Sequence, residues 1–552
     1  MRFVKFLGLF LALGFFNQAK AQDRYVVFLK YKPQSELTLA RPQDFLTTKS
    51  INRRLREKIP ADSLDLPIAG KYLMEVKTHA IDVLYSSKWL NALVLVATES
   101  QVNSLKNLPF VDRVELAAKG FLPRPGSKLE ESRLLLEIGK TTHPKWNYRE
   151  MEVQNNAYDF QNQLIGIDKM HEAGFTGKGI IVAVFDAGFP GMKNASPFAH
   201  LFTNNQIIGQ LDVVRPWNKE VFLDNQHGTN VTSLIASKEP GKLVAGAFDA
   251  SYILAITEEV ATEYRIEELN WIRAAEFADS LGVDIINSSL GYLDFDDPSM
   301  DYTLEKLDGK TSYITRGASI AAKKGILVVN SVGNYGTRGA SSLTAPSDAD
   351  GILSVGSVTN TSGVSAFSSR GPTGDGRIKP ELVAFGQSPV LVRSNGTVGA
   401  GQGTSFSAPQ IAALAAGLWQ ARPEWTKDQL ILNLLRSATQ YDKPDNNLGY
   451  GIPNFTNAYF GEILGVDEED RIPWKIYPNP LTNGDLTLVH DSQLQLQVKL
   501  FDSTGRLVSD QQLERNSTAF PFSINLAFLR PGMYFIQVFD GKNLYRSKLI
   551  KR

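Results

Sequence analysis

Runs of consecutive apolar residues mark the middle of the chain. One run covers residues 180–185 and ends directly at Asp186. Runs of this kind, without polar alternation, are typical of strands buried on both faces of a parallel sheet. A further apolar run covers residues 326–329, and residues 283–286 are apolar apart from Asp284. The pattern therefore predicts a mainly parallel sheet in this part of the chain.

Between these runs lie segments in which apolar residues have helical spacing. Val231, Leu234 and Ile235 are spaced i, i+3 and i+4, which predicts an amphipathic helix that begins close to His227. Residues 411–419 are small or apolar, as in a fully buried helix, and a proline precedes them where its missing N–H costs no helical bond. Strands that alternate with helices predict an α/β fold, in which helices flank the sheet.

The region before residue 150 has a strand–helix–strand pattern. Residues 25–29 and 91–97 are strand-like, and the chain resumes a strand at residues 111–117. Between the last two, Thr98 or Ser100 is placed to cap a helix whose apolar face carries Val102, Leu105 and Leu108. We expect a small α+β domain here.

The last part of the chain has short runs in which apolar and polar residues alternate. Turn residues separate these runs, for example Ser503-Thr504-Gly505 and Pro531-Gly532. Period-two runs with such turns predict a small antiparallel β-sandwich. The runs cover residues 486–489, 494–501, 533–539 and 544–550.

The composition of the chain excludes several kinds of function. The chain has 552 residues, a length typical of three or four domains. Its 58 basic and 58 acidic residues give a formal net charge of 0, which argues against a nucleic-acid partner. It has no cysteine, which excludes thiol nucleophiles, cysteine-ligated metals and disulfides.

The first residues have the pattern of a secretory signal. Arg2 and Lys5 precede the apolar stretch 6–16, and Ala19-Lys20-Ala21 fits a cleavage site with Gln22 as the first mature residue. A membrane anchor is the alternative, but this stretch is too short to cross about 30 Å of hydrocarbon. No later segment has enough uncharged apolar residues to span a membrane, so we expect an exported protein without a membrane helix.

Three residues are candidates for catalysis. Asp186 stands where its strand ends, which is where open α/β sheets carry functional groups, although an ordinary turn Asp fits as well. His227 opens its helix, and none of the five other His residues has comparable surroundings. Ser405 lies at the start of the buried helix, where free amides favour a developing anion; a simple helix cap is the alternative.

The order Asp186, His227, Ser405 resembles the subtilisin family of serine peptidases. The resemblance rests on the segments Asp186-Ala187-Gly188, His227-Gly228-Thr229 and Gly403-Thr404-Ser405-Phe406-Ser407-Ala408-Pro409, and it runs from about residue 157 to 460. It implies that Ser405 is the nucleophile, His227 its base and Asp186 the residue that orients His227. It also implies that Asn334 donates to the oxyanion, and that substrate binds along Ser289, Leu290, Gly291, Val332 and Gly333.

Two positions depart from the family's usual pattern. Ala187 replaces the usual Ser or Thr after the Asp, and Asn230 replaces the His that commonly follows His-Gly-Thr. Neither position carries the chemistry, so we expect them to affect fine tuning more than activity.

The flanking regions have resemblances of their own. The strand–helix–strand region looks like a subtilisin-type propeptide, which would act as folding template and intramolecular inhibitor. Tyr477-Pro478-Asn479-Pro480 and Leu529-Arg530-Pro531-Gly532-Met533-Tyr534 resemble the C-terminal sorting domain of the type IX secretion system. We thus expect a signal at 1–21, a propeptide at 22–150, a catalytic domain at 151–463, a linker at 464–471 and a β-sandwich sorting domain at 472–552.

One loop invites a metal interpretation. Asp294, Asp296 and Asp297 lie close together just after the predicted substrate-binding segment, and oxygen-rich loops can bind Ca²⁺. The spacing matches no EF-hand, so a solvated acidic loop or a patch for basic substrates is the alternative. We expect no required cofactor, and calcium only as a structural ion.

The sequence as a whole predicts a monomeric serine endopeptidase that passes the periplasm and is released or held at the outer cell surface. Its partners would be protein or peptide substrates, its own propeptide and the outer-membrane type IX machinery. A catalytically inactive surface adhesin with the same fold is the alternative. A serine esterase is disfavoured because no G-x-S-x-G motif occurs.

Overall fold

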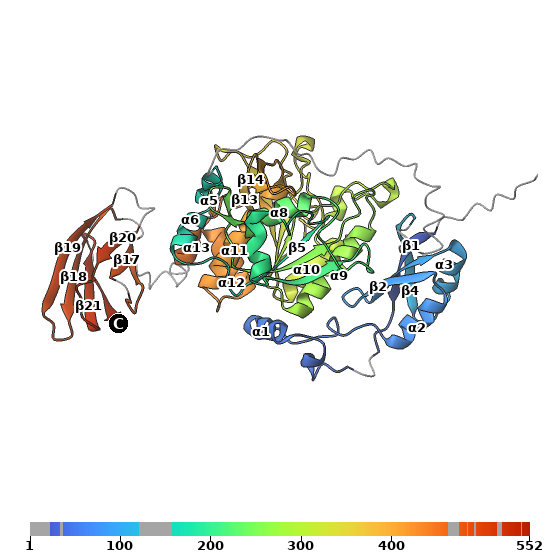
Figure 1. Cartoon of the computed structure of the whole chain (residues 1–552), viewed down its shortest axis with the longest axis horizontal. Helices are drawn as coiled ribbons and strands as arrows, with labels where there is room; N and C mark the ends of the chain where they lie inside the picture. Colours follow the sequence, from blue (N-terminus) through green and yellow to red (C-terminus); the bar gives the residue numbers. More distant parts are fainter. Residues whose placement is uncertain are drawn as a thin grey trace, which may run out of the picture. The chain divides into compact units, whose positions relative to one another are not determined.

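The computed structural model describes residues 22–33, 37–120, 157–461, 474–482, 484–490, 493–515, 521–542 and 544–552. The contacts divide the chain into two compact units, Met1–Phe460 and Gly461–Arg552, and each is described by itself (Figure 1). The predicted signal at 1–21 and the predicted linker at 464–471 lie outside the described residues.

The centre of the first unit is a seven-stranded sheet in the order β13-β12-β11-β10-β5-β9-β6. Each neighbouring pair is parallel, as the long apolar runs predict. The strands are β5 (Ile181–Asp186), β6 (Ile207–Asp212), β9 (Ser251–Ile256), β10 (Ile285–Ser288), β11 (Leu327–Ser331), β12 (Leu353–Val358) and β13 (Leu382–Phe385).

Helices cover both faces of this sheet. Strand β5 shows the arrangement, because Val182 and Val184 pack into one apolar cluster while Ala183 and Phe185 pack into another. The first cluster includes α8 (His227–Ala236) and α11 (Ala408–Ala421), and the second includes α9 (Ile266–Leu281) and α10 (Tyr313–Lys323). The predicted α/β fold with a mainly parallel sheet is confirmed.

Shorter elements complete the part of this unit that follows the front domain, residues 157–460, which is called the catalytic part below. The helices are α5 (Asp159–Leu164), α6 (Ile167–Glu172), α7 (Ala199–Thr203), α12 (Lys427–Arg436) and α13 (Phe455–Gly461). The 3₁₀ turns are η2 (Ser196–Phe198), η3 (Pro298–Met300), η4 (Leu304–Lys306), η5 (Gly336–Arg338) and η6 (Thr404–Phe406). Two small hairpins pair β7 (Lys238–Glu239) with β8 (Leu243–Val244) and β14 (Val390–Val392) with β15 (Val398–Ala400).

The front of the chain folds into an antiparallel sheet in the order β2-β3-β1-β4. Its strands are β1 (Asp23–Leu29), β2 (Asp82–Ser87), β3 (Ala92–Ala97) and β4 (Val111–Ala118), and its helices are η1 (Pro42–Asp44), α1 (Thr48–Glu57), α2 (Gly70–Thr78) and α3 (Glu99–Lys106). Thr98 caps α3 through a capping box with Gln101, one of the two caps expected. The sequence pattern missed β2, α1 and α2.

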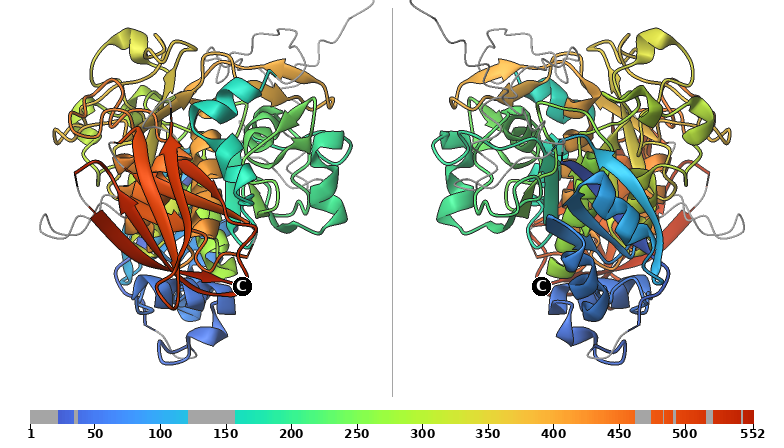
Figure 2. Two further views of the ribbon diagram at one scale, coloured as in Figure 1. Left: turned by 90° about the vertical axis from the view of Figure 1, so that its left-hand side faces the viewer. Right: turned by 90° about the vertical axis from the view of Figure 1, so that its right-hand side faces the viewer.

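This small sheet has two apolar faces. Val27 and Leu93 face α2 and α3, whereas Val26, Phe28 and Val94 belong to the cluster that contains α9 and α10. The sheet therefore packs across the outer side of α9 and α10, and the right-hand view of Figure 2 shows its blue strands beside the catalytic part of the unit.

The second unit is a sandwich of two antiparallel sheets. One sheet has the order β16-β17-β20 and the other β19-β18-β21-β22, and their inner faces share one apolar core (Figure 2, left, red). The strands are β16 (Trp474–Tyr477), β17 (Asp485–His490), β18 (Gln495–Asp502), β19 (Leu507–Glu514), β20 (Phe522–Asn525), β21 (Gly532–Phe539) and β22 (Leu544–Lys551). The predicted β-sandwich is confirmed, with β16, β19 and β20 in addition to the four runs expected.

Candidate functional site

The candidate catalytic residues gather at one edge of the parallel sheet. Asp186 is the last residue of β5, Ser289 follows the end of β10, and Asn334 follows the end of β11. β5, β10 and β11 are neighbours in the sheet, so their carboxyl ends lie side by side. This is the edge at which α/β sheets bind their ligands.

Asp186 and His227 are in direct contact. His227 Nδ1 lies 2.8 Å from Asp186 Oδ1 and 2.9 Å from Oδ2. Both side chains are buried, with exposed fractions of 0% for Asp186 and 1% for His227. Asp186 Oδ1 also accepts the backbone N–H of Ala187, which fixes the carboxylate from the other side. An ordinary turn Asp, the alternative interpretation, would not need this partner.

The start of α8 lies close to the end of β5, and this allows His227 to contact Asp186. α8 begins at His227, as predicted, and its second residue is Gly228. A Cβ atom at residue 228 would lie 2.3 Å from the carbonyl oxygen of Gly188 and 2.9 Å from the Cβ atom of Asp186. Glycine therefore allows the start of α8 to lie directly against the end of β5.

Ser405 lies in the turn η6, just before α11. This position differs from the expected one, since α11 begins at Ala408 and Ser407 stands at its N-cap. The alternative of a simple N-cap at Ser405 is therefore wrong. Gly403 precedes the turn with a φ of +151°, a backbone conformation that residues other than glycine rarely adopt.

The serine turn is bonded to the end of β10. Ser405 Oγ donates to the carbonyl oxygen of Ser289 at 3.2 Å, and Ser289 Oγ donates to the carbonyl oxygen of Ser405 at 2.8 Å. The next residue, Phe406, places its ring 5.7 Å from the imidazole of His227, measured between centroids. The same short turn thus touches both the predicted substrate segment and the Asp186–His227 pair.

Asn334 is held against the same turn by its side-chain oxygen. Asn334 Oδ1 accepts the backbone N–H of Thr404 at 2.9 Å and the hydroxyl of Thr404 at 3.0 Å. The hydroxyl of Thr404 also lies 3.2 Å from the carbonyl oxygen of Gly333. Thr404 is a positioning residue that the sequence reasoning missed, although it directly precedes Ser405.

The two predicted substrate segments are joined by Thr344. A Cβ atom at Gly291 would lie 2.1 Å from Thr344 Oγ1, and one at Gly333 would lie 2.9 Å from it. Thr344 N donates to the carbonyl oxygen of Val332, and Leu290 is buried beside them. Four of the five predicted substrate residues, Ser289, Gly291, Val332 and Gly333, therefore lie around the serine turn or Thr344, which no sequence pattern had marked.

The acidic loop after these segments uses its carboxylates within the protein. Asp294 pairs with Arg338, Asp296 accepts the N–H of Glu263, and Asp297 pairs with Lys119. Among the described residues, no group of three or more His, Asp or Glu side chains is arranged to hold a metal ion. Calcium at this loop therefore stays a prediction and enters no step below.

One buried carboxyl supports the helix layer beneath the site. Glu268 on α9 accepts the hydroxyl of Tyr302 at 2.7 Å and is 0% exposed. Burial raises the pKa of Glu268 from 4.5 to about 7, and it also raises the pKa of Tyr302 well above its usual value. The hydrogen bond from Tyr302 and the charge of Arg265 lower the pKa of Glu268, but burial outweighs them.

Comparison with known proteins places each part of the chain in a family. Residues 177–451 match the subtilase family of S8 peptidases, residues 24–131 match the S8 peptidase propeptide domain of Bacteroidota, and residues 475–552 match a secretion system C-terminal sorting domain. The central domain therefore belongs to the subtilase family, preceded by a propeptide domain and followed by a sorting domain. The sorting domain indicates secretion, with the protein attached to the cell surface or released.

Several curated relatives share the central domain. The chain is 26% identical over 281 residues to subtilisin-like protease SBT6.1 of Arabidopsis thaliana, which covers 49% of this chain and 24% of the relative. It is 29% identical over 318 residues to serine protease AprX of Bacillus subtilis, covering 52% and 67%. It is 28% identical over 292 residues to subtilisin of Bacillus pumilus, covering 52% and 94%.

The coverage of the relatives varies. The chain spans about a quarter of SBT6.1 and 63% of subtilisin amylosacchariticus and subtilisin J.

None of the helices in the described ranges is long and apolar enough to cross a membrane.

Proposed function

We propose that the protein is an exported serine endopeptidase, made as an inactive precursor. The observation that carries the proposal is the buried contact of Asp186 with His227 beside the turn that holds Ser405. A carboxylate, an imidazole and a serine hydroxyl in this order are the groups that peptide hydrolysis by acyl transfer requires. Proteins or peptides would be the substrates, and the enzyme would act as a monomer.

The proposed reaction begins at Ser405. A serine hydroxyl is a weak nucleophile until a base removes its proton. Asp186 binds Nδ1 of His227, so Nε2 on the opposite side of the ring is the nitrogen that takes the proton from Ser405 Oγ. The serine oxygen then attacks the substrate carbonyl carbon, and the imidazolium passes its proton to the leaving amine. Water repeats the sequence to release the acyl group.

The oxyanion that forms in each step needs preorganised donors. The amide oxygen of Asn334 is already occupied by Thr404, so its nitrogen is turned to the other side and can donate to the oxyanion. The backbone N–H of Ser405, in the turn before α11, would be the second donor. Donors fixed before the reaction stabilise developing charge at little reorganisation cost.

The front domain would inhibit the enzyme until it is cut off. Its sheet packs across α9 and α10, and its last described strand leads to Lys119, which pairs with Asp297 beside the substrate segments. The cut falls after this point by our proposal, and the sorting domain would address the chain to the outer-membrane secretion machinery. No observation favours the inactive adhesin.

The test is hydrolysis of a denatured protein by wild type and by His227→Ala and Asp186→Asn variants, all freed of the front domain by the same added peptidase. We expect kcat to fall by about 10⁴-fold or more in both variants, since each leaves the serine without a correctly oriented base. KM should change little, because neither residue contacts the substrate segments. Equal rates in wild type and His227→Ala would overturn the proposal.

A further inference from the structure

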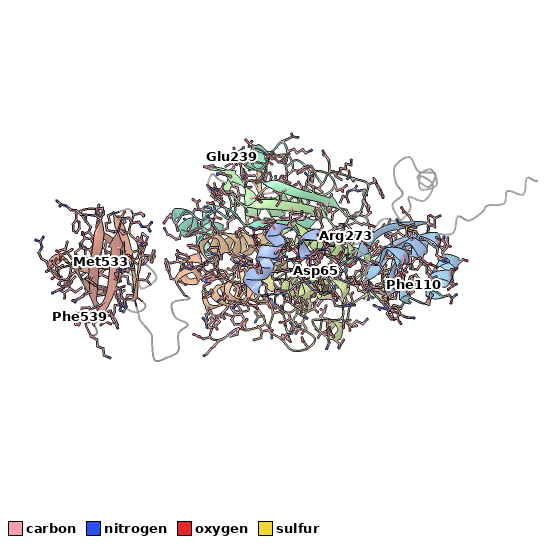
Figure 3. All side chains as sticks on the ribbon, turned by 90° about the horizontal axis from the view of Figure 1, so that it is seen from below. Asp65, Phe110, Glu239, Arg273, Met533 and Phe539 are labelled. Atoms are coloured by element: carbon pink, nitrogen blue, oxygen red, sulfur yellow. The ribbon has the colours of Figure 1, made fainter. Side chains whose placement is uncertain are left out.

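Part of the front domain leaves the small sheet and binds the catalytic part elsewhere. This part is residues 37–68, named here the arm, which contains α1. The arm contacts α9 through α1 and carries Asp65, whereas Phe110 marks the separate core of the small sheet (Figure 3). In Figure 1, α1 lies apart from α2 and α3 of the same domain.

The arm binds where α9 and α10 end and the next strands begin. α9 ends at Leu281 and leads to β10, and α10 ends at Lys323 and leads to β11. This is the amino edge of the parallel sheet, opposite the edge that carries Ser405. The backbone N–H of Thr47 donates to the carbonyl oxygen of Ser280 at 3.2 Å and so starts the contact.

Arg53 of α1 reaches into this edge. Its guanidinium donates to the carboxylate of Asp279, to the carbonyl oxygen of Val283, and to the carbonyl oxygen of Lys324 at 3.2 Å. Arg53 is 2% exposed and Asp279 is 0% exposed. A cation at the carboxyl end of α9 is also favoured by the helix dipole.

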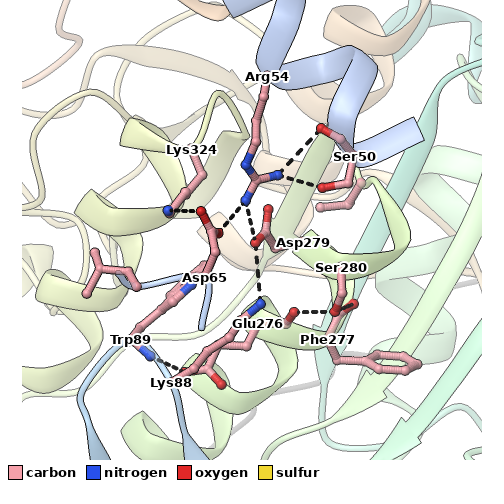
Figure 4. A network of polar contacts seen from close by, with 12 residues as sticks. Ser50, Arg54, Asp65, Lys88, Trp89, Glu276, Phe277, Asp279, Ser280 and Lys324 are labelled. Atoms are coloured by element: carbon pink, nitrogen blue, oxygen red, sulfur yellow. Dashed lines mark hydrogen bonds and ion pairs between the residues drawn. The ribbon is translucent and has the colours of Figure 1, made fainter. Parts of the chain in front are cut away.

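Arg54 and Lys324 extend the same network (Figure 4). Arg54 Nη2 lies 3.0 Å from Asp279 Oδ2 and 2.7 Å from Oδ1 of Asp65 on the arm. Lys324 Nζ donates to Asp65 Oδ2 at 2.9 Å and to Asp62 at 2.8 Å. Burial would raise the pKa of Asp279, but the charges of Arg53 and Arg54 outweigh it and keep that pKa below its usual value.

The catalytic part is shaped to receive the backbone of α1. A Cβ atom at Gly282 would lie 2.6 Å from the Cβ atom of Lys49, and one at Gly325 would lie 2.3 Å from Cγ of Glu57. Both glycines therefore admit the helix at a distance that other residues would forbid. Glu57 also accepts the backbone N–H of Lys427, the first residue of α12, at 3.0 Å.

The small sheet uses a different kind of interface. Its contact with α9 and α10 is mainly apolar and includes Phe28, Trp89 and Trp271. Its polar contacts there include Glu276, which accepts the hydroxyl of Ser87 at 2.6 Å and the N–H of Trp89 at 2.9 Å, and the buried ion pair of Arg24 with Glu259. The front domain therefore holds the catalytic part at two places, one mainly by apolar burial and one by a network of buried charges.

We propose that the amino edge carries a docking site for an arginine-bearing helix, whose occupant is α1, and that this site keeps the cut propeptide on the enzyme. The inference rests on the proposed function, because it assumes that the chain is cut between the front and catalytic domains. Two linked contacts are released far more slowly than either alone, since one holds the segment while the other opens. Breaking the charge network should therefore speed propeptide release without changing the catalytic residues.

The experiment measures release after the cut. Matured wild type, Arg53→Ala and Arg54→Ala proteins are passed over a sizing column at intervals, and the propeptide that elutes with the enzyme is quantified. Lys77→Ala is the control, because it removes a positive charge from an exposed position on α2 that has no contact with the catalytic part. We expect release at least about tenfold faster in both arginine variants, since leaving a buried charge unpaired is strongly unfavourable.

Raising the salt concentration gives a second expectation. Release by wild type should quicken only slightly between about 0.05 and 1 M NaCl, because the network is buried and salt screens buried ion pairs much less than exposed ones. Release rates that are equal in wild type, Arg53→Ala and Lys77→Ala would overturn the proposal.

If the arginine variants fail to fold, a second measurement tests the docking site. Hydrogen exchange is followed in the full chain carrying Ser405→Ala, which needs neither cutting nor activity. The amides of α1 should be protected at low salt, like those of β3. Fast exchange of α1 at low salt would overturn the docking site, whereas absence of activity in wild type would overturn only the proposed function.

Discussion

Ser405 and Ser289 are bonded to each other in both directions. Each side-chain hydroxyl donates to the other residue's carbonyl oxygen, at 3.2 Å from Ser405 and 2.8 Å from Ser289. Ser289 follows β10 and Ser405 precedes α11, so the pair ties the turn of the nucleophile to the sheet edge. The position of Ser405 therefore depends on a residue that was expected only to bind substrate.

The first prediction tests the hydrogen bonds between Ser289 and Ser405 with the variant Ser289→Ala. The substitution removes one hydrogen bond to the backbone of Ser405, and a bond of this kind contributes about 1 kcal/mol. We expect kcat to fall by about fivefold with a small change in the thermal midpoint. Peptide hydrolysis measures it, with Ser299→Ala on an exposed turn as the control. A kcat equal to that of the control would show that the bond does not position Ser405.

The second prediction concerns the approach of α8 to β5. In Gly228→Ala the new methyl group would meet the carbonyl oxygen of Gly188, so the start of α8 must move away from Asp186. A shift of about 1 Å at a catalytic group can cost about 10²-fold in rate, and we expect a loss of that size in kcat. Gly363→Ala is the matched control, because its nearest atom lies 3.7 Å away. Similar kcat values in both variants would contradict the account.

The third prediction concerns the oxyanion. In Asn334→Ala the side-chain donor is lost, and we expect kcat to fall by about 10²–10³-fold with KM nearly unchanged. The magnitude is the one measured for such a donor in subtilisin itself. Thr337→Ala, exposed in the same loop, serves as the control. A raised KM with an unchanged kcat would assign Asn334 to substrate binding instead.

The fourth prediction follows from the buried carboxyl on α9. The pKa of Glu268 is about 7 in the folded protein and about 4.5 when unfolded, so its favourable contribution to stability is present below about pH 4.5 and is lost as pH rises through 7. Glu268→Gln keeps an acceptor for Tyr302 but cannot ionise. We expect it to stabilise the chain by up to about 3 kcal/mol at about pH 8 and to lose this advantage near pH 4.

Thermal unfolding of the Ser405→Ala chain, with and without Glu268→Gln, measures this effect without self-digestion. The difference in thermal midpoint between the two proteins should be positive at alkaline pH and should shrink steadily with falling pH. A difference that is the same at both ends of the range would show that Glu268 does not ionise in the folded protein.

The sequence predicts the sheet and its catalytic edge well because both depend on local patterns. The apolar run before Asp186 and the helical spacing after His227 each specify an element and its end, and the ends carry the candidate residues. The front strands and the cap at Thr98 follow for the same reason. In a parallel sheet the carboxyl ends of neighbouring strands lie at the same edge, whatever the conformation of the loops.

The residues that the sequence reasoning missed act across long sequence separations. Arg53 lies in a segment with only two apolar residues, and its partners Asp279 and Lys324 are more than 200 residues away. Thr344 is an ordinary loop threonine until Gly291 and Gly333 are placed against it. The strand β19 is mostly polar and exposed, so it has no apolar alternation to mark it.

The central claim, that Ser405 is the nucleophile of a self-maturing peptidase, is tested most directly by labelling with a serine-directed fluorophosphonate. Secreted wild type and Ser405→Ala are compared for label and for mass. We expect wild type to be labelled and to have lost its front domain, and Ser405→Ala to be unlabelled and to keep it. Wild type that takes no label after its propeptide has been removed would contradict the account.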